Sequence, residues 1–160
     1  EDITYSGTVA GAMEAVLHNV PAISISQVYN NLNSNENQND WDFALAKQTI
    51  VNLVNKIFKD TFPLDKRKLL NVNIPQISIE KCNGIKITNS GYRVYGNDLR
   101  TYHNPKGEEF YWIGLHPLIW EANEDKSCDF EAIKENYVSI TPIQLDLTSY
   151  DDINKLKEWI

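Results

Sequence analysis

Hydrophobic residues in segment 6–18 recur at spacings of three and four, which predicts a helix with one apolar face. Ser6 stands at the position of an N-cap, and Pro21 follows at a point where helices end. The apolar positions are Val9, Ala12, Met13, Val16 and Leu17. The next run, 22–26, contains two isoleucines and predicts a buried strand. A helix followed directly by a strand is half of a βαβ unit, so we expect a further strand upstream of this helix.

Residues 41–59 carry the strongest helical pattern of the chain. Asp40 is the predicted cap of this helix, and Asp42 suits its positive first turn. The positions predicted to form its buried face are Phe43, Ala46, Lys47, Ile50, Leu53, Val54, Ile57 and Phe58. The preceding segment 30–39 holds six asparagines, a composition typical of a solvated loop.

Beyond residue 60 the pattern changes to short apolar runs separated by turn residues, which indicates strands. The predicted strands are 69–74, which Pro75 ends, then 92–95, 110–113 and 137–147, the last despite Pro142. Segments 77–81 and 85–88 flank Asn83 and Gly84, a pair typical of hairpin turns. Ser149 is the predicted cap of a final helix that reaches residue 160. The pattern therefore describes an α/β first part, an antiparallel-looking middle, and a closing strand and helix.

Composition places the 160 residues in one globular domain, with 42% hydrophobic and 23% charged residues. The formal net charge of −7 argues against a nucleic-acid partner, which usually requires a basic face. No apolar run approaches the roughly 18–20 residues of a membrane helix, so no membrane partner is expected. Cys82 and Cys128 are too few for a disulfide scaffold or a four-cysteine zinc site, and they fit free thiols in the cytoplasm. Because the chain starts with Glu1 and has Met13 as its only methionine, we expect it to be the later part of a longer polypeptide.

The first turn of the helix predicted at 6–18 is the most suggestive position for chemistry. A helix N-terminus presents unpaired N–H groups and about half a positive charge. Gly7 allows a ligand to approach the backbone closely, and Ser6 and Thr8 add hydroxyl groups. These features suit a phosphate group, while Ser6 equally fits a plain capping role.

Other candidate residues point to no reaction. The three histidines, His18, His103 and His116, lack the spacing of metal ligands on one helix. Asp129 and Asp146 lie beside hydrophobic segments, where turn or cap chemistry is the alternative to a catalytic role. No P-loop, nucleophile elbow, zincin motif or dinucleotide-binding fingerprint is present.

Four segments resemble, in the right order, the SurE family of metal-dependent survival-protein nucleotidases. Residues 2–14, DITYSGTVAGAME, are similar to its signature, and residues 70–75, LNVNIP, are similar to one of its strands. Residues 110–114, FYWIG, resemble its aromatic strand. The C-terminal signature has counterparts at 129–133, 137–143 and 146–148, so the resemblance covers residues 1–160.

This resemblance implies an α/β fold, a Rossmann-like core with an extended β-hairpin arm and a C-terminal strand-helix segment. We expect residues 1–76 to form the later part of the core, 77–120 the arm used in oligomerisation, and 121–160 the C-terminal segment. In the family, the arm and the C-terminal segment build homodimers and homotetramers by exchange between subunits.

The family removes phosphate from nucleoside 5′- and 3′-monophosphates, and some members act on short polyphosphate. By resemblance, Ser6, Gly7 and Thr8 line the phosphate side of the pocket. One divalent metal ion, Mg or Mn, is expected per active site, held by an Asp-Asp pair, a Ser and an Asn that lie upstream of this chain. The chain itself is therefore expected to contribute no catalytic residue and no metal ligand. Tyr150 stands where relatives often have His.

Two other functions remain open at this point. The chain could be a non-catalytic assembly module without its own metal site, or a nucleotide-binding regulator that keeps Ser6, Gly7 and Thr8 but needs no metal. The presence of the metal ligands in the same molecule distinguishes these functions from the enzyme.

Overall fold

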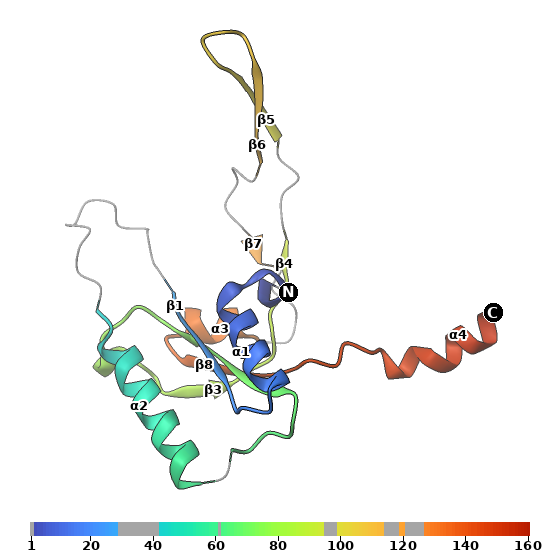
Figure 1. Ribbon diagram of the computed structural model, residues 1–160. Coiled ribbons are helices and arrows are strands. Elements are labelled where there is room, and N and C mark those ends of the chain that lie inside the picture. The colour runs from blue at the N-terminus through green and yellow to red at the C-terminus, as the bar shows by residue number, and fades with distance from the viewer. Residues whose placement is uncertain (1, 29–41, 61, 95–98, 114–118, 121–126) are drawn as a thin grey trace.

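The computed structural model describes residues 2–28, 42–60, 62–94, 99–113, 119–120 and 127–160. It has the mixed α/β structure that the sequence predicts (Figure 1). The helices are α1 (Gly7–Leu17), α2 (Ala44–Lys59), α3 (Asp129–Lys134) and α4 (Ile153–Trp159), with 3-10 turns η1 (Asp2–Tyr5), η2 (Ile79–Lys81) and η3 (Tyr150–Asp152). The strands are β1 (Ile23–Gln27), β2 (Lys68–Ile74), β3 (Ile85–Ile87), β4 (Arg93–Val94), β5 (Leu99–His103), β6 (Glu109–Ile113), β7 (Ile119–Trp120) and β8 (Val138–Gln144). The Asn-rich segment 30–39 and Asp40 lie outside the described residues.

Four strands form the central sheet in the order β1-β2-β8-β3. β1 and β2 are parallel, β8 runs antiparallel to β2, and β3 runs parallel to β8. The parallel pair β1 and β2 is the part typical of a Rossmann-like core, because a helix precedes each of these strands.

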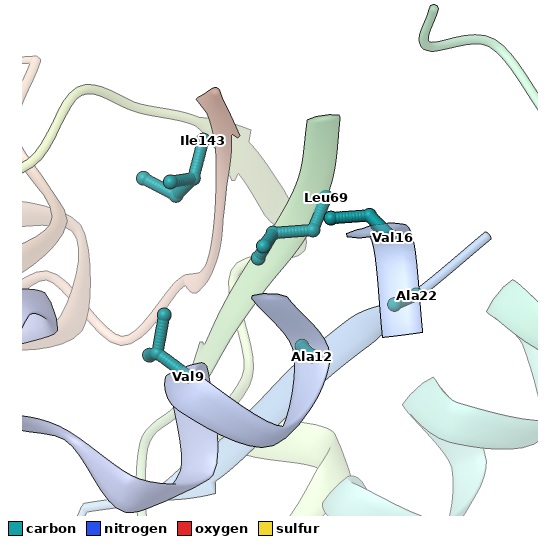
Figure 2. Packing of buried hydrophobic residues seen from close by; sticks show 6 residues of the cluster. All are labelled: Val9, Ala12, Val16, Ala22, Leu69 and Ile143. Carbon is teal, nitrogen blue, oxygen red and sulfur yellow. The ribbon is translucent and has the colours of Figure 1, made fainter. Parts of the chain in front are cut away.

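The two faces of the sheet carry separate hydrophobic clusters, because side chains alternate between faces along a strand. Helix α1 covers one face with Val9, Ala12 and Val16, which pack with Ala22, Leu69 and Ile143 (Figure 2). Helix α2 covers the other face. There the buried residues are Leu45, Ala46, Val72, Ile74, Val138 and Ile140.

Pro142 lies inside β8, and the register explains why this strand tolerates it. Leu70 is opposite Pro142, and the N–H of Leu70 donates to the carbonyl oxygen of Ala22, the residue before β1 (3.1 Å). The backbone groups of Leu70 therefore point away from β8, and the nitrogen of Pro142 points away from β2. On that side β3 pairs only with residues 138–140, so the missing N–H costs no ladder bond.

A hairpin of β5 and β6 extends from the body as an arm, and β4 pairs with β7 near its base (Figure 1). Asn104 shapes the tip of the arm, since its Oδ1 accepts from the N–H groups of Lys106 (2.9 Å) and Glu108 (3.0 Å). Large apolar side chains are exposed on both faces of this hairpin. They are Leu99, Tyr102, Phe110, Tyr111, Trp112 and Ile113.

The base of the arm is fixed to the start of α3. Asp129 Oδ1 accepts from the N–H of Gly91 at 2.8 Å. A Cβ on Gly91 would lie 2.2 Å from Cδ2 of Phe130, so only glycine fits this contact. The guanidinium group of Arg93 lies over the Phe130 ring, 5.0 Å from its centroid.

The hairpin predicted around Asn83 and Gly84 is wrong. Gly84 does adopt the positive φ of a turn, at 113°. However, residues 79–81 form η2, and β3 pairs in parallel with β8 instead of turning back on the preceding segment. Asn83 is held by distant residues, because its backbone N–H donates to the carbonyl oxygen of Asn136 and its side chain to that of Glu135. Tertiary partners therefore override the local turn signal.

The predicted face of α2 is partly wrong. The buried positions are Leu45, Ala46 and Thr49, whereas Phe43 and Phe58 are exposed. The helix begins at Ala44, whose N–H donates to Asp42 Oδ1 at 2.8 Å, so Asp42 supplies the acceptor at the start of the helix. Helix α3 and strand β5 are two elements that the sequence pattern does not predict.

Candidate functional site

Ser6 is the N-cap of α1, as the sequence predicts. Its backbone is extended, and its Oγ accepts from the N–H of Val9 at 3.3 Å. The first intrahelical bond runs from Ala10 N to Ser6 O, at 2.9 Å. The N–H groups of Gly7 and Thr8 precede that bond, and such groups point out of the helix end. The hydroxyl hydrogen of Ser6 stays available to an anion, because this hydroxyl acts as acceptor in the cap.

The surroundings of Gly7 are open. A Cβ built on Gly7 meets no described atom within 4 Å, and its φ is not in the left-handed region. The fold of the described chain therefore does not require glycine at this position. Thr8 is exposed beside it. The structure thus keeps the three residues Ser6, Gly7 and Thr8 together at an accessible helix end, where N–H and hydroxyl donors face solvent.

Helix α1 runs antiparallel to β1, so its N-terminus lies toward the end of the sheet to which β1 and β2 point (Figures 1 and 2). Val16 packs beside Ala22 at the other end of the helix. In open α/β sheets, ligands bind at the carboxyl ends of the parallel strands. The candidate site is therefore the region between the first turn of α1 and the ends of β1 and β2.

Polar side chains on the α1 face of β1 and β2 lead toward this region, and they come from strands that are distant in sequence. Ser24 Oγ donates to Asn71 Oδ1 at 2.8 Å, and both residues are buried. Ser26 and Asn73 form the next pair in the register. The alternating asparagines of the LNVNIP motif are the sequence signal for Asn71 and Asn73, but the motif alone predicts no role for these two residues or for the serines that pair with them.

Buried hydroxyl groups continue this polar surface across the sheet. Thr88 Oγ1 lies 2.8 Å from Ser139 Oγ and 2.7 Å from Thr141 Oγ1. On the other face of the sheet, at the last residue of β1, Gln27 Nε2 donates to the carbonyl oxygen of Asp42, whereas the buried Gln27 Oε1 has no partner among the described residues.

Clusters of the usual metal-binding side chains are expected to be absent from this chain. Among the described residues, no group of three or more His, Cys, Asp or Glu side chains is placed to hold a metal ion. Asp129 and Asp146 form turn and capping hydrogen bonds, which is the alternative to a catalytic role that the sequence leaves open. Asp129 Oδ1 accepts from the N–H groups of Gly91 and Phe130, and Asp146 Oδ1 accepts from the N–H of Thr148.

Asp146 has the most strongly shifted acidity in the described chain. Hydrogen bonds from Tyr150 and Thr148 lower its pKa to about 2, and the same contact with Asp146 raises the pKa of Tyr150. Asp146 lies in the turn after β8, and Tyr150 is the first residue of η3. Their contact shapes the turn that leads into α4, and Figure 1 shows α4 apart from the sheet and from α1.

A shallow pocket lies at the opposite end of α1 from Ser6. Its lining includes Val16, Val20 and Phe62, together with Lys66 and Arg67. This pocket contains none of the predicted site residues. Within the described part of the chain, no helix is long and apolar enough to cross a membrane.

Known proteins resemble this chain along its whole length. The family model of Survival protein SurE matches residues 1–97. The 5′-nucleotidase SurE of Aliarcobacter butzleri is 62% identical over 160 residues, which are 100% of this chain and 61% of that relative. The 5′-nucleotidase SurE of Helicobacter hepaticus is 51% identical over 164 residues, again with 100% of this chain and 61% of the relative covered.

A crystal structure agrees with these similarities. The SurE protein from Aquifex aeolicus matches with a TM-score of 0.73 and 34% identity, over 99% of this chain and 59% of that chain. The chain thus spans about 60% of the length of the relatives that it matches. The sequence motifs, the α/β sheet and these similarities together establish that the chain belongs to the SurE family.

Proposed function

We propose that the chain is part of a nucleotidase that hydrolyses nucleoside 5′- and 3′-monophosphates, and that it contributes the phosphate side of the active site. The observation that carries this proposal is the open N-terminus of α1, where Ser6, Gly7 and Thr8 present hydroxyl and N–H donors together. The name 5′-nucleotidase SurE, which the relatives carry, supports the same activity.

In this function, the first turn of α1 binds the phosphate of the substrate. The N–H groups of Gly7 and Thr8 donate to the phosphoryl oxygens, and the Ser6 and Thr8 hydroxyls donate to the same group. Water attacks phosphorus, the P–O bond to the sugar breaks, and a nucleoside and inorganic phosphate leave. Donors that are fixed before the reaction stabilise the charge on the phosphoryl oxygens at little reorganisation cost.

The resemblance implies one divalent ion, Mg or Mn, in each active site. We assign no residue of this chain to the ion, and no cluster of three or more His, Cys, Asp or Glu side chains among the described residues suggests one. Its ligands are expected in the part of the family's length that this chain does not span. The intact gene product is therefore the form in which activity is to be tested.

Substitutions at Ser6 test the phosphate site. Ser6→Ala should lower kcat/KM for a nucleoside monophosphate at least tenfold in the intact gene product with Mg or Mn. It should also destabilise the fold by about 1 kcal/mol, since it removes the capping acceptor. Ser6→Asp separates the two effects, because aspartate caps the helix as well as serine but repels a phosphate.

We expect Ser6→Asp to fold with wild-type stability and to lose at least as much activity as Ser6→Ala. Phosphate release and urea unfolding are the measurements. If Ser6→Asp has wild-type kinetics, the first turn of α1 does not bind the phosphate. An intact gene product of wild-type fold that binds nucleotides without turnover would instead identify the nucleotide-binding regulator. An intact gene product that neither binds nor hydrolyses them would identify the assembly module.

A further inference from the structure

The α1 face of the sheet carries two consecutive polar pairs on β1 and β2 that differ in one respect. Ser24 and Asn71 are buried and hydrogen-bonded to each other at 2.8 Å. Ser26 and Asn73, two residues further along each strand, occupy the same register relation and face the same way. They are only partly buried, and no side-chain hydrogen bond joins either of them to another described residue. The first pair is joined by a hydrogen bond within the pair, and the second has none among the described residues.

The unsatisfied pair lies level with the first turn of α1. Val16 packs beside Ala22, which gives a common starting point for helix and strand. A helix advances 1.5 Å per residue and a strand about 3.3 Å. From that point, Thr8 lies roughly 12 Å along the helix and Ser26 lies about 13 Å along the antiparallel strand. Ser26 and Asn73 are therefore the sheet residues that face the space beside the phosphate-binding turn.

We propose that Ser26 and Asn73 form a subsite for the sugar hydroxyl groups of the nucleotide, an inference that rests on the proposed function. A hydroxyl group needs one donor and one acceptor. An amide and a serine hydroxyl offer both without carrying charge. A partly buried polar pair that lacks internal partners gains most from such a ligand, because unsatisfied polar groups are costly when water is displaced.

Ser26 and Asn73 suit sugar hydroxyl groups better than they suit a metal ion or the phosphate. Ser and Asn oxygens can join a metal site, but this pair has no carboxylate beside it, so it lacks the charged ligand with which proteins usually bind a divalent ion. It also has no cation or helix end for a phosphate dianion, whereas the first turn of α1 has one. Ser26 and Asn73 would thus position the nucleoside while the helix end holds the phosphate.

A substrate pair tests the sugar contact in the intact gene product. A ribonucleoside 5′-monophosphate carries the 2′ and 3′ hydroxyls, and the 2′,3′-dideoxy analogue lacks both. We expect the wild type to have at least tenfold higher kcat/KM for the ribonucleotide. In Asn73→Ala this preference should fall close to one, because both substrates then lack the contact. Ser26→Ala should reduce the preference in the same direction.

Ser24→Ala is the matched control, since it removes a hydroxyl from the neighbouring satisfied pair. It should lower thermal stability and leave the preference for the ribonucleotide at the wild-type value. If Asn73→Ala instead loses the same factor on both substrates, or keeps the wild-type preference, the sugar assignment is overturned.

A binding measurement separates this inference from the proposed function. Should the wild type hydrolyse neither substrate, the proposed function fails, and calorimetry with the uncharged ribonucleoside tests the subsite alone. Binding that Asn73→Ala weakens at least tenfold supports the subsite. Absent binding, or equal affinity in wild type and variant, overturns it.

Discussion

Gly7 is a residue whose identity the described chain does not explain, because the space beside it is open. Gly11, one turn further along α1, is also exposed and has the same open surroundings. Alanine at either position is compatible with the helix, and in a helix interior it is favoured over glycine by about 1 kcal/mol. The two glycines therefore form a natural pair for separating folding from function.

We predict that Gly7→Ala lowers kcat/KM for a nucleoside monophosphate at least tenfold, because the added methyl group obstructs the approach of a phosphate to the backbone. Gly11→Ala should keep wild-type kinetics. Both variants should unfold in urea at or above the wild-type midpoint. The idea fails if Gly7→Ala is as active as the wild type, or if the two variants lose activity together.

Which residues could be predicted from the sequence depends on how local their contacts are. The capping role of Ser6 follows from three neighbouring residues, and the structure confirms it. The pairing of Ser24 with Asn71 joins residues 47 positions apart, so no local pattern reveals it. The same holds for Ser26 and Asn73, whose proximity depends on the register of β1 and β2.

At the scale of elements, the sequence predicts well those parts that are stabilised by their own periodicity. Helix α1 and strands β1 and β2 lie within one residue of their predicted bounds. The segment after β2 was predicted wrongly because β3 depends on a parallel partner about fifty residues away. The predicted buried face of α2 is partly wrong because the side of the helix that packs on the sheet carries Leu45 and Thr49, whereas the bulkier Phe43 is exposed.

The turn between β8 and η3 has a predictable response to acid. The pKa of Asp146, about 2 in the folded chain, is depressed below its ordinary value of 3.8 by the Tyr150 hydroxyl and Thr148. A depressed carboxyl pKa stabilises the fold above the ordinary value, and this contribution is lost as the pH falls through the folded value. The turn should therefore hold at neutral pH and loosen between about pH 4 and pH 2.

We predict that Tyr150→Phe raises the pKa of Asp146 toward its ordinary value, because the largest source of the shift is removed. A pH titration of the carboxyl carbon by NMR measures this change. Tyr102→Phe is the control, since Tyr102 stacks on Phe110 in the arm, at a centroid distance of 5.6 Å. An Asp146 pKa that is the same in Tyr150→Phe and in the wild type would contradict the role of the hydroxyl.

For the whole molecule, the distribution of apolar surface is uneven. The arm exposes aromatic side chains on both faces, and the tail exposes Leu156, Trp159 and Ile160 (Figure 1). Exposed apolar patches of this kind mark interaction surfaces. We propose, as the family resemblance implies, that the intact protein is a homodimer or homotetramer, and this distribution of apolar surface supports it.

Tyr111 and Ile113 lie on one face of β6, and we predict that replacing both with serine weakens self-association at least tenfold. Sedimentation velocity over a concentration series measures the dissociation constant. Lys106→Ser, an exposed change at the tip of the arm, should keep the wild-type constant. If the wild type is monomeric, or if the double variant associates as tightly as the wild type, the arm does not mediate self-association.

The position of Pro142 also determines where another strand can join the sheet. On the far side of β8, β3 covers only residues 138–140, and beyond it Pro142 offers no N–H to an incoming chain. The opposite edge, β1, is five residues long and pairs with β2 alone among the described strands. An added strand that pairs with more than three residues is therefore accommodated better beside β1 than beside β8. The strand that we expect upstream of α1 can therefore pair with β1 in the intact protein, while Pro142 leaves the far side of β8 a poor place for an added strand.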